Sequence, residues 1–479
     1  MKISLNLVLR SLAILSLVTG CGSDGDAGSS TGTTETVGGT SASAGSGANG
    51  TSANKGGAAG TASSRATSAG GVPNTSSYRE PVETIDLNAA PVPITTLNLE
   101  VDASTIPLLD ADPYHSNDVP GALVDGNAVR YDPIDVNYRG AYALRTLIIS
   151  NATQRNWKLK FSKAQPYQGR REWNFNYEPH VRQRLAYWLM HLANVKVPSA
   201  RHVVLRVNAQ VHGLHLEFED PDNKTWLADK FGDNSGDLFK AAYDVPDETA
   251  YFATLEILGS TDSDYAMHYR KMTNNDDPTK ATDFSSLRNF ITKLNQTPDG
   301  EFEAFLRQNF DVERFISYLV VANFISHWDS FPQRPKNYWL YQVPATGKWT
   351  FIPWDMDATF QSGKFTLNPM GTDVSVFYQF DGFVEYRGRN AAEGTARPLI
   401  TRTMKVPAFR TAYVARYREA IATFLAKDYL LGQVTRLFEM NRAVAQPDEL
   451  QGLTDARSDM EEFINKRSAS VSTELAKQP

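Results

Sequence analysis

Two aspartates, Asp355 and Asp357, directly follow an apolar run in the segment KNYWLYQVPATGKWTFIPWDMDATF, residues 336–360. Carboxylates beside apolar surroundings are unfavourable unless a metal ion or a partner charge compensates them. The residue types and their spacing therefore indicate a chemical role for this pair. What that role is depends on the side chains that the neighbouring segments bring to the same place.

The segment predicts a β-hairpin that brings an amide to the pair. Residues 344–347 (PATG) have the composition of a tight turn, with Pro and Gly at its ends. If Val343 faces Lys348 across this turn, the register sets Asn337 opposite Trp354. The Asn337 amide is then expected next to the first aspartate of the pair.

A third carboxylate, Asp329, is expected at the same open end of the hairpin, because a long predicted helix ends there and a short loop leads into the first strand. Together the set holds Asp329, Asn337, Asp355 and Asp357. Carboxylate and amide oxygens suit Mg²⁺ or Mn²⁺ better than zinc. The alternative for each aspartate alone is that it caps a turn.

Composition excludes several other classes of protein. The chain has 479 residues, a net charge of −6 and a pI of about 5.8, so it offers no strong basic field and nucleic acid is not an expected partner. Its one cysteine, Cys21, excludes disulfides within the chain.

The N-terminus has the pattern of an export signal. Residues 1–21 (MKISLNLVLRSLAILSLVTGC) place Lys2 and Arg10 around a short apolar stretch. The end of this stretch resembles the lipobox of bacterial lipoproteins, which implies acylation of Cys21 and a lipid anchor on a bacterial membrane. The alternative is a plain secretory signal with an incidental cysteine.

Residues 22–78 consist mainly of Gly, Ser, Thr and Ala. Such a segment cannot bury enough apolar surface to offset its ordering entropy, so a flexible tether is predicted.

The remainder is predicted to be strand-rich over residues 79–265 and mainly helical over 266–479. Strands are expected at 136–140 and 157–161, and a hairpin at 201–219, from alternating apolar residues. Helices are expected from helical spacing and capping residues at 180–192, 283–294, 312–328, 408–424, 429–443 and 454–475.

The hairpin motif carries a family resemblance. Asn323, Asp329, KNYWLY (336–341), GKW (347–349) and FIPWDMD (351–357) resemble the CotH kinase family, named for a spore-coat protein kinase, over about residues 130–475. The resemblance implies an α+β, atypical protein-kinase-like fold of two lobes, with a strand-rich N-lobe and a mainly helical C-lobe. It also implies binding of ATP with Mg²⁺ or Mn²⁺ and phosphorylation of Ser or Thr.

By this resemblance Asp329 matches the catalytic aspartate, which would orient the substrate hydroxyl and accept its proton. Asn337 matches the metal-binding asparagine, and Asp355 the metal-binding aspartate. Asp357 would support them.

The nucleotide-binding residues implied by the family are less specific. Lys158 and Lys160 share one strand face, and the pattern does not choose between them as the phosphate-contacting lysine. Glu219 is the expected partner carboxylate, and Arg139 lies in a matching Tyr-Arg-Gly. The family commonly has a hydroxyl-rich stretch after this Arg-Gly, whereas here residues 141–144 read AYAL.

The sequence thus predicts an exported, membrane-tethered kinase that phosphorylates Ser or Thr of envelope or surface proteins, its own tether among the candidates. The alternative is a non-catalytic surface scaffold, or an adhesion or assembly protein, that keeps the fold.

Overall fold

Among the described residues, seven strands close into a barrel, because apolar side chains alternate along them and share one interior. The computed structural model describes residues 93–114, 117–140, 142–241, 252–364, 370–381 and 396–478. Tyr78–Pro479 form one compact unit. The barrel strands are β1 (Thr95–Val101), β2 (Val119–Val124), β3 (Arg130–Tyr138), β4 (Trp157–Lys160), β5 (Glu172–Tyr177), β6 (Ala200–Val207) and β7 (Gln210–Glu219).

The barrel closes in the spatial order β1-β2-β3-β4-β5-β7-β6. Strand β1 pairs in parallel with β6, where Thr95 lies opposite Val203, and the other pairs are antiparallel. Leu97, Leu159 and Phe175 point into the interior and are fully buried.

A second sheet has the order β11-β10-β8-β9, with β8 (Leu238–Ala241), β9 (Tyr269–Lys271), β10 (Tyr338–Gln342) and β11 (Trp349–Pro353). Its residues form one apolar cluster with the outer face of β7, to which Phe218, Trp339 and Trp354 belong. This shared cluster joins the barrel to the sheet that carries the hairpin.

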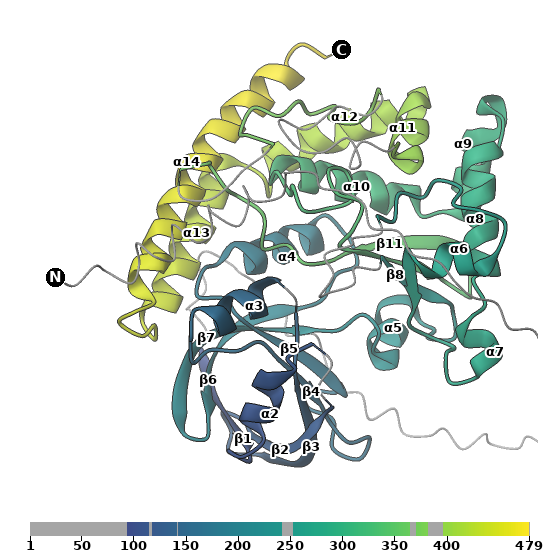
Figure 1. Ribbon diagram of the computed structural model, residues 1–479. Coiled ribbons are helices and arrows are strands. Elements are labelled where there is room, and N and C mark those ends of the chain that lie inside the picture. Colours follow the sequence, from purple (N-terminus) through teal and green to yellow (C-terminus); the bar gives the residue numbers. More distant parts are fainter. Residues whose placement is uncertain are drawn as a thin grey trace, which may run out of the picture. The chain divides into compact units, whose positions relative to one another are not determined.

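Helices cover the rest of the unit. Figure 1 shows α4 between the barrel and α10, with α13 and α14 side by side along one edge. The helices are α2 (Ile106–Ala111), α3 (Tyr142–Ile149), α4 (Arg182–Leu192), α5 (Lys224–Phe231), α6 (Asp262–Ala266), α7 (Pro278–Ala281), α8 (Ser285–Gln296), α9 (Asp299–Asn309), α10 (Val312–Phe324), α11 (Pro398–Lys405), α12 (Pro407–Ala422), α13 (Lys427–Arg442) and α14 (Leu450–Leu475).

The α+β class and both predicted hairpins are confirmed. In the second hairpin Val343 N–H donates to the Lys348 carbonyl at 2.9 Å, and Trp354 N–H to the Asn337 carbonyl at 3.0 Å, as the predicted register requires. The predicted division after residue 265 falls between β8 and β9, which are neighbours in the second sheet.

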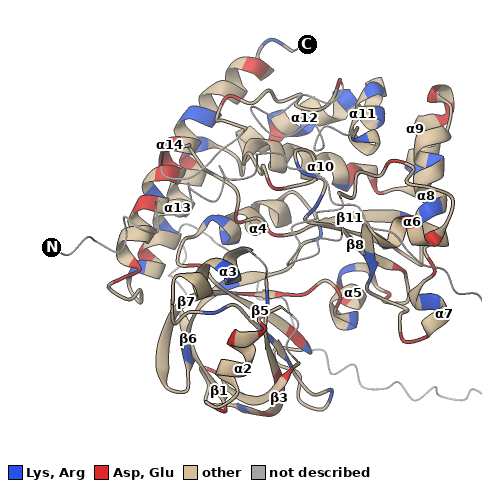
Figure 2. Cartoon of the chain, in the orientation of Figure 1, with Lys and Arg blue, Asp and Glu red and all other residues tan. Residues whose placement is uncertain are grey.

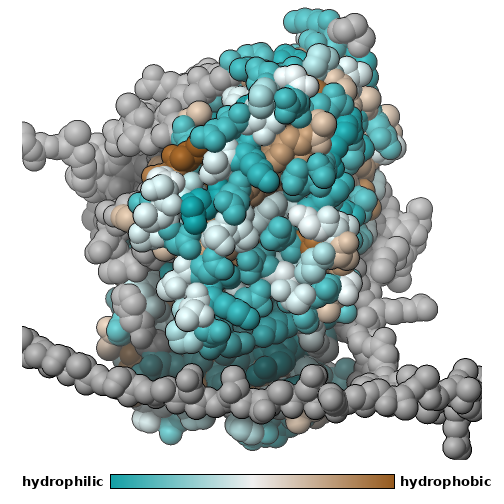
Figure 3. Space-filling view, turned by 90° about the vertical axis from the view of Figure 1, so that its right-hand side faces the viewer, coloured by the Kyte–Doolittle hydropathy of each residue, from teal (hydrophilic) through white to brown (hydrophobic). Residues whose placement is uncertain are grey.

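The surface carries both signs of charge. Figure 2 shows Lys and Arg interspersed with Asp and Glu along α13 and α14, where Arg457–Glu461 and Lys466–Glu462 pair one turn apart. The face shown in Figure 3 is largely hydrophilic, with apolar residues in small separate groups. Within the described ranges, no helix has both the length and the apolarity that crossing a membrane requires.

Candidate active site

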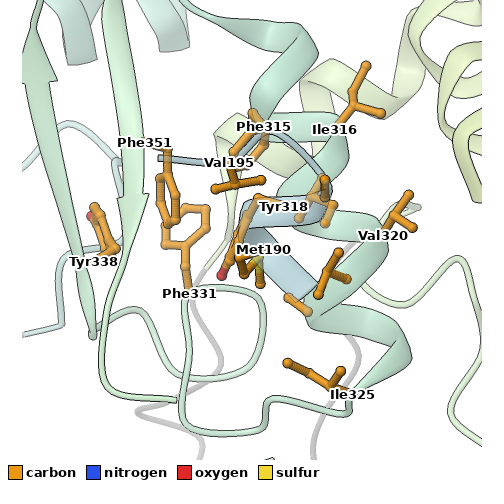
Figure 4. Close-up of a cluster of buried hydrophobic side chains, with 14 of the residues drawn as sticks. Met190, Val195, Phe315, Ile316, Tyr318, Val320, Ile325, Phe331, Tyr338 and Phe351 are labelled. Carbon is orange, nitrogen blue, oxygen red and sulfur yellow. The ribbon is translucent and has the colours of Figure 1, made fainter. Parts of the chain in front are cut away.

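The loop after α10 carries Asp329, and aromatic rings hold its buried side. The ring of Phe331 lies 5.0 Å from that of Tyr338 and 5.5 Å from that of Phe351, measured between centroids. Tyr318 of α10 contacts Phe351 at 4.6 Å, so these rings lie between α10 and the β10–β11 hairpin (Figure 4). Because packed aromatic pairs resist displacement, the cluster fixes the loop against the hairpin.

Asp329 and Asn337 meet at the open end of the hairpin. The Asn337 side-chain amide donates to the Asp329 carboxylate at 3.1 Å and to the Asp329 backbone carbonyl at 2.7 Å. Asn337 has a left-handed backbone, φ +57°, which asparagine tolerates better than most residues. The predicted proximity of these two side chains is confirmed.

Two cations approach the Asp329 carboxylate. Lys336 Nζ lies 3.0 Å from it and Arg334 Nη1 lies 3.3 Å from it. Burial acts to raise the pKa of Asp329, but Lys336 and Arg334 outweigh it and hold that pKa below the ordinary value. The carboxylate is therefore ionised at neutral pH, as a proton acceptor must be.

Helix α4 fixes the segment that follows the hairpin. The Asp355 N–H donates to the Tyr187 hydroxyl at 3.3 Å, and the Met356 N–H donates to Gln183 Oε1 at 3.2 Å. His327 contributes a ring nitrogen 3.0 Å from the Asp355 carbonyl. These contacts hold Asp355 in a left-handed conformation, φ +54°, which is unusual for a non-glycine residue.

The two aspartates of the motif carry an excess of negative charge. Burial, reinforced by Asp329, raises the pKa of Asp355 in spite of nearby Arg139. Desolvation together with Asp355 and Glu178 raises the pKa of Asp357, although this residue is solvent-exposed and solvent screens part of the repulsion. Burial also raises the pKa of Glu178 to about 8. A bound cation would relieve this repulsion.

A divalent cation fits Asp355, Asp357 and Asn337 by donor chemistry, since Mg²⁺ commonly takes one or two carboxylates together with substrate phosphates. Among the residues that the structure describes, however, the one trio of metal-ligating side chains with ligand atoms within 4.8 Å of one another is Glu172, Asp220 and Asp222. Asp329, Asp355 and Asp357 therefore do not converge on one point. Asp329 instead binds cationic side chains, which suits a different role.

The acidic trio surrounds Lys158. Its Nζ lies 2.7 Å from Glu172, 3.1 Å from Asp220 and 3.8 Å from Asp222. Burial acts to lower the pKa of Lys158, but Asp220, Asp222 and Glu172 outweigh it and raise that pKa. A lysine ammonium already lies among these carboxylates.

Lys160 does not reach the centre described above. Its Nζ pairs with Asp118 at 2.7 Å, and the side chain is 38% exposed on the outer face of β4. Lys160 therefore forms an ion pair at the protein surface.

The predicted pairing of Glu219 with an N-lobe lysine is wrong. Glu219 is fully buried and binds Arg170 at 2.9 Å, with further hydrogen bonds from Trp226 Nε1 at 3.0 Å and the Ser199 N–H at 2.9 Å. It lies opposite Trp173, an inward residue, whereas Lys158 lies opposite Asn174 on the outer face. One residue of register separates Glu219 from Asp220, the carboxylate that Lys158 contacts.

Arg139 and Lys240 lie over the aromatic rings beside the hairpin. The Arg139 guanidinium carbon is 5.0 Å from the Phe218 ring centroid and 6.0 Å from that of Trp354. Lys240 Nζ is 4.9 Å from the Trp339 ring centroid and 5.8 Å from that of Trp354. Both cations act electrostatically on Asp355.

Four residues of this centre were not predicted: Glu178, Gln183, Tyr187 and Lys240. The first three lie on or just before α4, more than 140 positions from Asp355, and no one-dimensional pattern links the two segments. Lys240 belongs to GDLFK (236–240), a further and weaker match to the CotH kinase family, and this match was the available signal. Cys21, the tether at 22–78 and Ala141 lie outside the described residues.

Known proteins resemble this chain over most of its described length. The profile of the family described as CotH kinase protein matches residues 136–471. Inner spore coat protein H of Bacillus subtilis is 24% identical over 377 residues, which cover 77% of this chain and 94% of that protein. Invasin CotH2 of Rhizopus delemar is 22% identical over 224 residues, or 44% of this chain and 35% of that protein.

Among solved structures, a chain from a Shewanella oneidensis complex of HipA, HipB and operator DNA aligns over 82% of this chain and 76% of that chain. Its sequence identity of 10% and TM-score of 0.32 are too low to establish a common fold.

Proposed function

The chain belongs to the CotH kinase protein family, and on that premise we propose that it is an atypical protein kinase that transfers the γ-phosphate of ATP to Ser or Thr. The observation that carries the proposal is the Asp329–Asn337 pair, hydrogen-bonded at 3.1 Å beside the two aspartates of the hairpin. In this proposal the barrel corresponds to the N-lobe, and the helices with the β10–β11 hairpin correspond to the C-lobe of a two-lobed kinase.

The roles follow from the contacts. Asp329 orients the acceptor hydroxyl and takes its proton as the hydroxyl oxygen bonds to the γ-phosphorus and the bond to the bridging oxygen breaks, releasing ADP. Asn337, Asp355 and Asp357 would hold Mg²⁺ or Mn²⁺. When bound, the cation supplies positive charge to the phosphate oxygens. Asn337 also fixes the Asp329 carboxylate through its hydrogen bond.

The proposal includes export and a lipid anchor at Cys21, supported by the signal-like residues 1–21. Surface or envelope proteins, together with the hydroxyl-rich tether, are the proposed acceptors, since a tether in cis has a high effective concentration. Labelled fatty acid that still enters a Cys21→Ser chain would contradict the anchor.

One observation favours a second function, a non-catalytic scaffold. Lys336 and Arg334 already contact the Asp329 carboxylate, at 3.0 and 3.3 Å, and would compete with an acceptor hydroxyl. A scaffold would retain the fold and form no phosphoprotein.

Transfer of labelled γ-phosphate decides between the two functions. We expect Asp329→Ala and Asp355→Ala each to lower phosphate transfer to protein by about 10²–10⁴-fold. Phosphosite mapping of the tether should show the same loss. Asp381→Asn, at an aspartate 76% exposed that pairs with Arg410, is the matched control and should retain activity. Unchanged transfer in both alanine variants would sink the mechanism, and no transfer by the unmodified chain would favour the scaffold.

A further inference from the structure

Two cations beside the hairpin share one aromatic ring. Arg139, which follows β3, and Lys240, on β8, both lie over Trp354, at 6.0 and 5.8 Å from its centroid. They come from the barrel and from the second sheet, about a hundred positions apart. Like charges drawn to one ring repel each other, so the arrangement favours an anion between or beside them.

In the part of the chain that the structure describes, neither cation has an anionic partner at contact distance. Within the described residues, the Arg139 guanidinium donates to the Asn176 side-chain oxygen and Lys240 contacts only the two tryptophan rings; neither forms an ion pair. Asp220 is the strongest electrostatic neighbour of Lys240, but its carboxylate already accepts from Lys158 and from Asn174 Nδ2, each at 3.1 Å. The charges of Arg139 and Lys240 therefore remain available to a ligand.

Lys158 presents the opposite environment. Its ammonium contacts two carboxylates and lies 3.8 Å from a third, so the group as a whole is negative. A phosphate approaching Lys158 would meet Glu172, Asp220 and Asp222, and their repulsion opposes binding.

The cation pair is also placed next to the metal-binding candidates. Both Arg139 and Lys240 lie over the ring of Trp354, and Trp354 directly precedes Asp355, the carboxylate expected to hold a divalent cation. Two or three linked phosphates could therefore contact the cation pair at one end and the metal at the other.

We propose that Arg139 and Lys240 form a polyphosphate subsite, and that Lys240, rather than Lys158 or Lys160, is the lysine that contacts the nucleotide phosphates. The identity of the ligand as a nucleotide rests on the proposed function, whereas the anion site rests on the cation pair itself.

Calorimetric titration of the full chain tests this inference. The probes are pyrophosphate and ADP, each at constant Mg²⁺, with adenosine as the phosphate-free comparison. Lys240→Met keeps the length and apolar packing of the side chain but removes its charge. Loss of one charge-assisted contact should weaken pyrophosphate and ADP binding about tenfold or more, and Lys240→Arg should restore most of it.

Two variants serve as controls. Lys230 also lies over a tryptophan, 5.8 Å from the Trp226 centroid on α5, so Lys230→Met removes a comparable lysine outside the subsite and should change pyrophosphate affinity less than about twofold. Lys160→Met removes the other candidate lysine of β4, which pairs with Asp118 at the surface, and should leave pyrophosphate affinity nearly unchanged. Circular dichroism verifies that each variant is folded.

The results distinguish failure of the phosphate subsite from failure of the proposed kinase activity. Unchanged binding in folded Lys240→Met, loss of binding in folded Lys160→Met, or no pyrophosphate or ADP binding by the unmodified chain would overturn the subsite. Binding that depends on Lys240 in a chain that transfers no phosphate to protein would uphold the subsite and reject the kinase.

Discussion

Asp357 carries a charge that its surroundings disfavour. Desolvation, Asp355 and Glu178 all raise its pKa, although the residue is solvent-exposed and solvent screens part of this repulsion. The side chain accepts no hydrogen bond within the described residues. The neighbouring Asp355 is held by α4 through its backbone and cannot move away. Without a bound cation, the Asp355 and Asp357 carboxylates repel each other, and a cationic ligand would relieve this repulsion. Such a site lowers stability in exchange for function.

Replacing Asp357 should stabilise the metal-free protein. A raised folded-state pKa means that the folded chain binds protons more tightly than the unfolded chain, so stability is lost as pH rises from about 4, the ordinary aspartate pKa, through the folded value. Asp357→Asn removes this loss, and because solvent screens the exposed carboxylate, its melting temperature at neutral pH should rise by only about 1 °C. The gain should disappear towards pH 4.

Differential scanning calorimetry with EDTA, across pH and then with Mg²⁺, measures both effects. Mg²⁺ should raise the melting temperature of the unmodified chain more than that of Asp357→Asn. A variant that melts lower than the unmodified chain without metal would show that Asp357 is structurally required instead.

At the residue scale, the local sequence pattern predicted which side chains meet at the open end of the hairpin, but not which carboxylate contacts Lys158. The turn composition fixed the register, and with it the meeting of Asn337 and Asp329. Which carboxylate lies beside Lys158 depends on which of two residues at the end of β7, Glu219 or Asp220, points to the outside of the barrel. Glu219 and Asp220 are adjacent in sequence, so the pattern could not distinguish the inward from the outward carboxylate.

At the element scale, the aromatic cluster couples the core to the loop of Asp329. Phe331 is fully buried and contacts both hairpin strands, through Tyr338 and Phe351. Since Asp329 lies two positions before Phe331 and Asn337 directly precedes Tyr338, packing rather than hydrogen bonding alone sets the separation of Asp329 and Asn337.

Phe331→Ala should therefore impair function beyond its effect on stability. Truncation of a buried phenylalanine costs about 3–5 kcal/mol. Phe290→Ala is the matched control, because Phe290 is 4% exposed and packs on Phe310 at 5.9 Å and on Trp349 at 5.5 Å, at the turn end of the hairpin and away from the loop of Asp329. At a temperature where both variants remain folded, Phe331→Ala should transfer phosphate far more slowly than Phe290→Ala. Equal rates would mean that the cluster serves stability alone.

The sequence predicted several of the helices but not the barrel. Helices α8, α10, α12, α13 and α14 follow from apolar periodicity within one segment. The barrel does not, because its closure depends on the parallel β1–β6 pair, and β1 was not predicted. The second sheet likewise assembles β8 and β9 with a hairpin about 70 to 100 positions downstream.

At the scale of the whole molecule, α14 joins distant parts of the chain to the helix that leads into the loop of Asp329. Asp459 binds Arg182 of α4 at 3.0 Å and accepts from the Ser362 N–H at 3.1 Å. Arg467, fully buried, binds the Asn323 side chain at 2.6 Å and the Phe324 carbonyl at 3.3 Å, where α10 ends. The C-terminal helix thus caps the helix that leads to Asp329.

Arg467→Met should destabilise the fold and disturb the site together. The change leaves several buried oxygens of α10 and its neighbours without a donor, which costs on the order of 3 kcal/mol or more. Arg442→Met is the control, since Arg442 is 58% exposed and pairs with Glu439 on the same helix, a contact that contributes little. Thermal unfolding with and without MgADP gives both readouts. We expect Arg467→Met to melt well below the control and to respond less to MgADP by mass action. A normal response in the folded variant would show that α14 stabilises the fold without positioning the loop.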